Sequence, residues 1–185
     1  MRLKSYDSCH CKKQLKEIYE KSFPKNERFP FWILVKCARG NNARLYAVID
    51  YETDNCCGMQ FIVRYDDITY LMYLAIDEQY RNKGLGANAL KNLVARNNNI
   101  LLCIEKPSTK SNDIKLRRKN FYLRNGFYET GCVIVDSDVE YEFLSSVKGY
   151  IPTEEVLKKR YTAMSNNPLV KIIIKHTFDL NIKYV

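Results

Sequence analysis

The sequence predicts an α/β protein in which a mixed β-sheet carries helices on both faces. Strand-like runs over residues 44–50, 59–64 and 68–76 are separated by short turns, which indicates an antiparallel meander. A helical pattern over 85–97 and a strand over 100–105 follow, and this order is typical of a parallel β-α-β unit. Both faces of the run 68–76 are apolar, so we expect a central strand covered on each side.

The remaining elements follow from periodicity and from residues that end helices or strands. Before the meander we expect a strand over 2–6 and helices over 12–22 and 29–37. After the β-α-β unit, the expected elements are a helix over 114–124, strands over 127–135 and 139–144, and a helix begun by the capping-box pattern Thr153-Glu154-Glu155-Val156. We therefore expect one domain over 1–150, with 151–185 packed on it as an extension of helix and strand.

Composition narrows the class of protein. No apolar run approaches the ~20 residues that span a bilayer, and Met1 to Lys13 lack the apolar segment of a signal peptide. We therefore expect a cytoplasmic protein without membrane contact, in which the seven cysteines are free thiols. A zinc site would need Cys9-His10-Cys11 with Cys56-Cys57, and these spacings match no usual ligand pairs, so no metal is expected.

Positive charge is concentrated at two places. The net charge is +9, which suits a polyanionic partner or a phosphorylated cofactor. Residues 106–119 carry six basic side chains against one acidic: Lys106, Lys110, Lys115, Arg117, Arg118 and Lys119 against Asp113. The second place is the turn after the central strand, which reads Arg81-Asn82-Lys83-Gly84-Leu85-Gly86-Ala87. A basic glycine turn that opens a helix can hold a phosphate on its backbone N–H groups.

Two cofactor classes compete for this turn. Gly84-x-Gly86-x-x-Ala89 fits the dinucleotide pattern, with Glu105 where a ribose-binding acid is expected. Against this, residues 77–83 separate the strand from the first glycine, a meander precedes it, and only one β-α-β unit follows.

The second interpretation uses the whole run from Arg81 to Ala87. Arg81-x-x-Gly84-x-Gly86, followed by Phe121-Tyr122-x-x-Asn125-Gly126-Phe127, resembles the GNAT superfamily of acyl-CoA-dependent N-acetyltransferases. The similarity extends over roughly residues 12–145. The segment from Phe23 to Pro30 is also similar to small bacterial members of the superfamily, for most of which no substrate is established.

The resemblance implies a GNAT fold in which the sheet splays between the strands 68–76 and 100–105 and acetyl-CoA, a co-substrate, enters the opening. It implies that backbone groups of Leu74, Ala75 and Ile76 pair with the pantetheine and the acetyl carbonyl. The residues it assigns to the rest of the cofactor site are Arg81, Asn82, Lys83, Gly84, Leu85, Gly86, Ala87 and Arg118.

Catalytic candidates follow from what acetyl transfer to an amine requires. Tyr122 matches the tyrosine that acts as general acid toward the thiolate in many members; its alternative role is packing on an amphipathic helix. Glu105 closes an apolar strand where the sheet should splay and is the candidate base; its alternative role is a strand-end charge paired with Arg117 or Arg118. A base acting through water, or no dedicated base, also fits. By fold analogy, the acceptor site is lined by Glu27, Arg28 and Phe31.

The expected activity is transfer of an acetyl group from acetyl-CoA to a primary amine of a small molecule or a protein, by direct attack. The alternatives are a non-catalytic acyl-CoA-binding module and, ranked well below it, a basic nucleic-acid-binding protein. The chain is expected to act as a monomer or homodimer.

Overall fold

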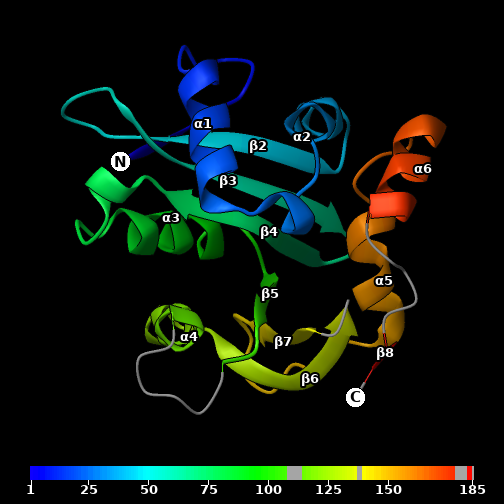
Figure 1. The fold of residues 1–185 in the computed structure, drawn as a ribbon. Coiled ribbons are helices and arrows are strands. Elements are labelled where there is room, and N and C mark those ends of the chain that lie inside the picture. Colours follow the sequence, from blue (N-terminus) through cyan, green and yellow to red (C-terminus); the bar gives the residue numbers. More distant parts are fainter. Residues whose placement is uncertain (108–113, 137–138, 178–182, 185) are drawn as a thin grey trace.

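The protein folds around one mixed sheet. The structure is a computed structural model that describes residues 1–107, 114–136, 139–177 and 183–184. Its eight strands lie in the order β1-β2-β3-β4-β5-β7-β6-β8 (Figure 1). Their bounds are β1 Arg2–Ser5, β2 Ala43–Ile49, β3 Cys56–Tyr65, β4 Ile68–Ile76, β5 Asn99–Glu105, β6 Tyr128–Asp136, β7 Val139–Ser145 and β8 Lys183–Tyr184. As expected, β2 to β4 form an antiparallel meander and β4 pairs with β5 in parallel.

Helices cover both faces of this sheet. They are α1 Lys12–Ser22, α2 Phe31–Ala38, α3 Leu85–Val94, α4 Ile114–Arg124, α5 Glu154–Thr162 and α6 Pro168–Thr177, with short 3-10 helices η1 Lys25–Glu27 and η2 Glu78–Tyr80. Consecutive strand residues belong to different apolar clusters. Leu101 belongs to the cluster that contains side chains of α1, α2, α5 and α6, whereas Leu102 belongs to the one that contains side chains of α3 and α4. Because neighbouring strand residues point to opposite faces, the two clusters are the two sides of the sheet.

Element boundaries follow local chemistry. The second helix begins at Phe31 rather than at residue 29, because Pro30 has an extended ψ of 134° at the N-cap. The third ends at Val94, before the expected residue 97, and Asn97 satisfies the end: its amide donates to the Leu93 carbonyl at 2.7 Å. The hydroxyl of Thr153 accepts from the Val156 N–H and caps α5, as the capping-box pattern predicts.

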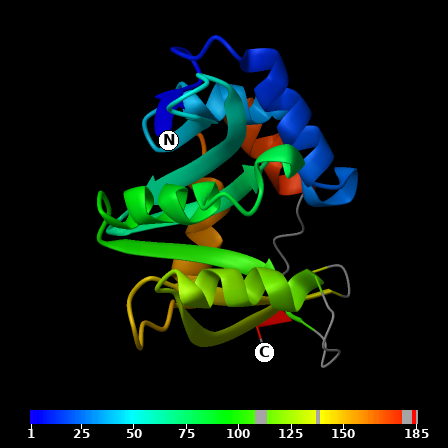
Figure 2. The same cartoon turned by 90° about the vertical axis from the view of Figure 1, so that its left-hand side faces the viewer.

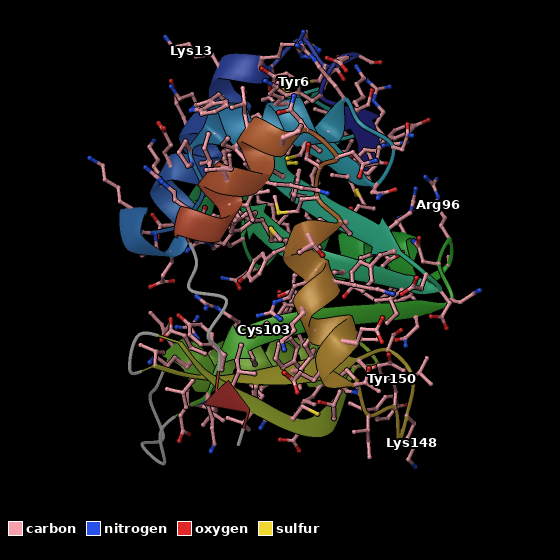
Figure 3. All side chains as sticks on the ribbon, turned by 90° about the vertical axis from the view of Figure 1, so that its right-hand side faces the viewer. Tyr6, Lys13, Arg96, Cys103, Lys148 and Tyr150 are labelled. Carbon is pink, nitrogen blue, oxygen red and sulfur yellow. The ribbon has the colours of Figure 1, made fainter. Side chains whose placement is uncertain are left out.

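The C-terminal segment adds helices and an edge strand to the same sheet. Helix α5 contacts β3, and β8 pairs with β6 through Val135 and Lys183. In Figure 3, α5 crosses beside Cys103 of β5. Arg160 of α5 is buried, with its guanidinium 4.5 Å from the Tyr161 ring centroid and 5.4 Å from that of Phe143. The sequence patterns left α6 and β8 unplaced.

The seven cysteines are free thiols, five of them buried. Among the described residues, no group of three His, Cys, Asp or Glu side chains is arranged to hold a metal ion. None of the helices within those residues is long and apolar enough to cross a membrane.

Candidate active site

The sheet opens between its two parallel strands. Pairing of β4 with β5 runs from Ile68 opposite Asn99 to Leu71 opposite Leu102, and no further. Figure 2 shows the two strands diverging toward their C-terminal ends. At this point the register between β3 and β4 shifts, which leaves Met72 as an extra residue in β4. Such a bulge bends the strand, and the remaining residues of β4 line an opening in the sheet.

The backbone of β4 faces this opening at alternate residues. The Asp77 N–H donates to the Cys57 carbonyl at 2.9 Å. Because hydrogen-bonded pairs alternate along an antiparallel ladder, Ala75 directs its backbone groups toward β3, whereas Leu74 and Ile76 direct theirs toward the opening. The Ile76 carbonyl accepts from the Arg81 side chain at 3.1 Å. Leu74 and Ile76 can therefore pair with a ligand through their backbone, while Ala75 could contribute only its side chain.

The turn after β4 presents backbone donors. Gly84 is the N-cap of α3 with a φ of 75°, and Asn82 also has a positive φ, of 62°. The Asn88 N–H is bonded to the Gly84 carbonyl at 2.9 Å. The amides of residues 85–87 come before this first helical bond and lack intrahelical acceptors. No side chain caps this helix, so these donors suit a phosphate group.

The basic side chains of the turn have mixed roles. Arg81 pairs with Glu78 at 3.3 Å in addition to its bond to Ile76, so it also shapes the turn. The Lys83 ammonium lies 5.4 Å from the centroid of the Tyr80 ring. Arg81 and Lys83 are both exposed, so each is accessible to an anionic ligand.

The two halves of the sequence motif meet at Gly86. A Cβ at this glycine would lie 3.2 Å from the Phe121 ring of α4 and 3.6 Å from the Ile76 side chain. The Phe121 side chain therefore reaches the first turn of α3 where a side chain is missing, and this contact links the glycine turn to the Phe121-Tyr122 pair.

Tyr122 lies beside this contact on α4. Its ring is 9% exposed and packs against Phe121 and Phe127, with centroids 5.3 and 5.7 Å apart. Burial raises the pKa of Tyr122 to about 12, against a smaller opposite effect of Arg118. The hydrogen bonds found among the described residues do not involve its hydroxyl. The phenol is thus held by packing alone, on the face of the sheet that α3 and α4 cover.

Carboxylates stand on the opposite face. Glu105 is two residues beyond Cys103, which packs with the cluster under α1 and α2, so its side chain points to that face. Its carboxylate pairs with the Lys115 ammonium at 2.5 Å. Burial raises the pKa of Glu27, the neighbouring charge of Glu105 raises it further, and Arg118 and Lys115 oppose the shift. Glu27, Glu105, Lys115 and Arg118 therefore interact electrostatically as one cluster of charges.

The other two acceptor-site candidates make structural contacts. Arg28 donates to the carbonyls of Glu20 and Phe23 at the end of α1. Phe31 is 9% exposed and packs on Tyr19, with centroids 5.6 Å apart. Of the three sequence candidates, Glu27 is the one that the structure brings to Glu105.

Two features of the site had no clear sequence signal. Lys115 appeared as one of six basic residues, and its pairing with Glu105 depends on how α4 returns over β5. The Met72 bulge is a matter of register, which residue type does not reveal.

Comparisons with known proteins match part of the sequence to one family and the fold to solved structures. Residues 41–129 match the family described as acetyltransferase (GNAT) domain. No curated protein matches the sequence. Among solved structures, a protein of Bacteroides thetaiotaomicron described as an acetyltransferase of the GNAT family superposes with a TM-score of 0.64 at 23% identity, over 84% of this chain and 90% of that one.

Two further structures share the fold. An aminoglycoside 6'-N-acetyltransferase in complex with coenzyme A has a TM-score of 0.61 at 15% identity, over 83% of this chain and 100% of its own. The ribosomal-protein-S18-alanine N-acetyltransferase of Escherichia coli has a TM-score of 0.57 at 13% identity, over 78% of this chain and 91% of its own. The family match covers residues 41–129, and the superpositions show that the chain has the fold of these acetyltransferases.

Proposed function

We propose that this protein transfers an acetyl group from acetyl-CoA to a primary amine by direct attack. The observation that carries the proposal is the arrangement around the opening between β4 and β5. Outward backbone groups of Leu74 and Ile76 line it, Tyr122 lies on one face of the sheet, and the carboxylates of Glu27 and Glu105 lie on the other. A nucleophile can thus approach from one face while the leaving group departs toward the other.

Binding of acetyl-CoA is supported by the turn before α3. Its residues fit a pyrophosphate, because a glycine with positive φ is followed by helix N-terminal amides that no side chain caps. Arg81, Lys83 and Arg118 add positive charge along the path to the opening, and the outward backbone of Leu74 and Ile76 suits an amide-bearing chain such as pantetheine. The aminoglycoside acetyltransferase that shares this fold was solved with coenzyme A.

The chemistry assigned to the chain has three parts. Glu27 or Glu105 accepts a proton from the acceptor ammonium, so that the amine becomes nucleophilic. The outward N–H of Leu74 donates to the carbonyl oxygen as negative charge develops on it. Tyr122 has a pKa of about 12, above the ~8.5 of a thiol, so proton transfer from its phenol to the departing thiolate is uphill by itself. Tyr122 therefore donates to the sulfur as charge develops on it and takes up the proton that the acceptor nitrogen releases when the amide forms.

The acceptor amine is a cation before it reacts, and the two carboxylates favour binding of a cation. The superposed enzymes act on an aminoglycoside and on a protein alanine. We accordingly propose a small-molecule or protein amine as the acceptor. The aromatic and apolar side chains beneath α1 and α2 form the wall next to these carboxylates.

A screen of primary amines tests the proposal. The protein is incubated with acetyl-CoA and each amine, and released thiol is followed against a no-amine control. We expect thiol release that depends on one class of amine and on Tyr122. Calorimetric binding of CoA without turnover of any amine in a broad panel would instead favour the non-catalytic acyl-CoA-binding module, and absence of CoA binding would contradict both.

A further inference from the structure

An amine of the protein itself already lies at the candidate base. The Lys115 Nζ is 2.5 Å from a Glu105 carboxylate oxygen. The lysine side chain is 38% exposed and that of Glu105 is 17% exposed, so the pair is partly shielded from water. Glu105 ends β5 at the opening of the sheet, which is where the proposed function puts the acetyl group.

The same helix face carries Lys115 and the proposed acid. Residues 115, 118 and 122 of α4 are spaced by one and two helical turns, so their side chains share one side of the helix. Arg118 acts electrostatically on both Tyr122 and Glu27, and Lys115 acts on Glu27. Lys115 thus lies among the proposed acid and base groups, in the position that an acceptor ammonium would take.

We propose that Lys115 is a self-acetylation site: its ε-amine accepts the acetyl group of acetyl-CoA bound to the same molecule. This inference rests on the proposed function. The ammonium gives one proton to Glu105, and its nitrogen forms a bond to the acetyl carbonyl carbon as the carbon–sulfur bond breaks. Tyr122 protonates the sulfur and regains a proton from the nitrogen. The products are acetyl-lysine, the free thiol of CoA and one proton, which Glu105 passes to water.

Acetylation changes the charge next to the carboxylates. The ammonium becomes a neutral amide, so Glu105 and Glu27 lose a cation. The positive charge of Lys115 lowers the pKa of Glu27, hence the pKa of Glu27 rises when that charge is removed. Self-acetylation therefore alters the same carboxylates that would bind an external amine.

The test is peptide mapping of the full chain after incubation with acetyl-CoA and no added amine. Lys106 is the matched control lysine: it directly follows Glu105, but its ammonium pairs with Glu140 at 2.8 Å and its side chain is 46% exposed. We expect acetyl-Lys115 to form with a first-order rate constant that does not depend on protein concentration. Glu105→Gln and Tyr122→Phe should each slow this modification about tenfold or more, while any acetyl-Lys106 stays unchanged.

Three outcomes would overturn the inference. The first is equal acetylation of Lys115 and Lys106 that does not depend on Glu105, which is uncatalysed acetylation. The second is a rate that scales with protein concentration, which is transfer between copies. The third is an unmodified Lys115 while an added amine is acetylated. In the third case the proposed function stands and self-acetylation fails. If no amine of any kind is acetylated although CoA binds, the proposed function itself fails. Lys115→Arg, which keeps the cation, confirms the assignment by abolishing the modified peptide in a protein that still binds CoA.

Discussion

Replacing Tyr122 by Phe separates catalysis from packing at one position. The change removes the phenol oxygen and keeps the ring, whose neighbours Phe121 and Phe127 lie 5.3 and 5.7 Å away. Among the described residues that oxygen makes no hydrogen bond, so the substitution breaks none there. We therefore expect the free energy of unfolding to be unchanged or slightly higher. By contrast, Tyr122→Ala empties a buried ring site and should cost about 3–5 kcal/mol.

The kinetic effect should be large. Loss of a general acid lowers kcat by about 10²–10⁴, or roughly 2.7–5.4 kcal/mol of transition-state stabilisation at 1.36 kcal/mol per tenfold. The measurement is thiol release from acetyl-CoA with an amine found in the screen, together with calorimetry of CoA binding and urea unfolding. CoA affinity should stay close to that of the wild type.

Tyr128→Phe is the matched control, because Tyr128 is 41% exposed and lies outside the opening. It should leave kcat unaltered. Full turnover in Tyr122→Phe would refute the reasoning, since the thiolate would then leave unassisted or take its proton from another group. A large loss of stability in Tyr122→Phe would show that the phenol is a structural group.

The remaining predictions concern the carboxylates, the glycine turn and the buried phenols. A base works when deprotonated, so kcat/KM should rise with pH through the raised pKa of Glu27. Glu27→Gln should flatten this acidic limb of the pH profile, and Lys115→Gln should move the limb to higher pH. Loss of the limb only in Glu105→Gln would make Glu105 the base. Gly84 and Gly131 have φ values of 75° and 77° and open space around them. Gly84→Ala and Gly131→Ala should therefore each lower the free energy of unfolding in urea by roughly 1 kcal/mol, but only Gly84→Ala should weaken CoA binding. Equal CoA affinities of the two variants would count against the glycine turn as the phosphate site. The folded-state pKa values of buried tyrosines are raised by desolvation, so their contribution to stability is present below the unfolded value of ~10 and falls as pH increases beyond it; alkaline urea titrations that show constant stability would contradict this. These tyrosines are Tyr19, Tyr65, Tyr70, Tyr73 and Tyr122.

Features that depend on neighbouring residues could be predicted from the sequence. The glycine turn, the meander, the β-α-β unit and the Thr153 cap all follow from short-range chemistry, such as Gly84 supplying a positive φ. The splay of the sheet was expected from family resemblance, and the pairing that stops at Leu71 confirms it.

Features that depend on distant segments could not be predicted in the same way. Glu27, on the loop between α1 and α2, is influenced by the charge of Glu105 at the end of β5, and neither local sequence encodes that proximity. The ion pair of Lys115 with Glu105 likewise depends on α4 returning across the sheet. Strand β8 spans two residues and exists through its pairing with β6, so no periodicity could indicate it.

Amide hydrogen exchange in β4 tests the central claim most directly, because the claim is that the outward backbone of this strand holds acetyl-CoA. The amides of Leu74, Ala75 and Ile76 are followed with and without CoA. Leu74 and Ile76 point to the opening and should become more protected on binding, whereas Ala75 is already directed toward β3 and should change little. CoA binding that leaves the exchange of Leu74 and Ile76 unchanged would contradict the account.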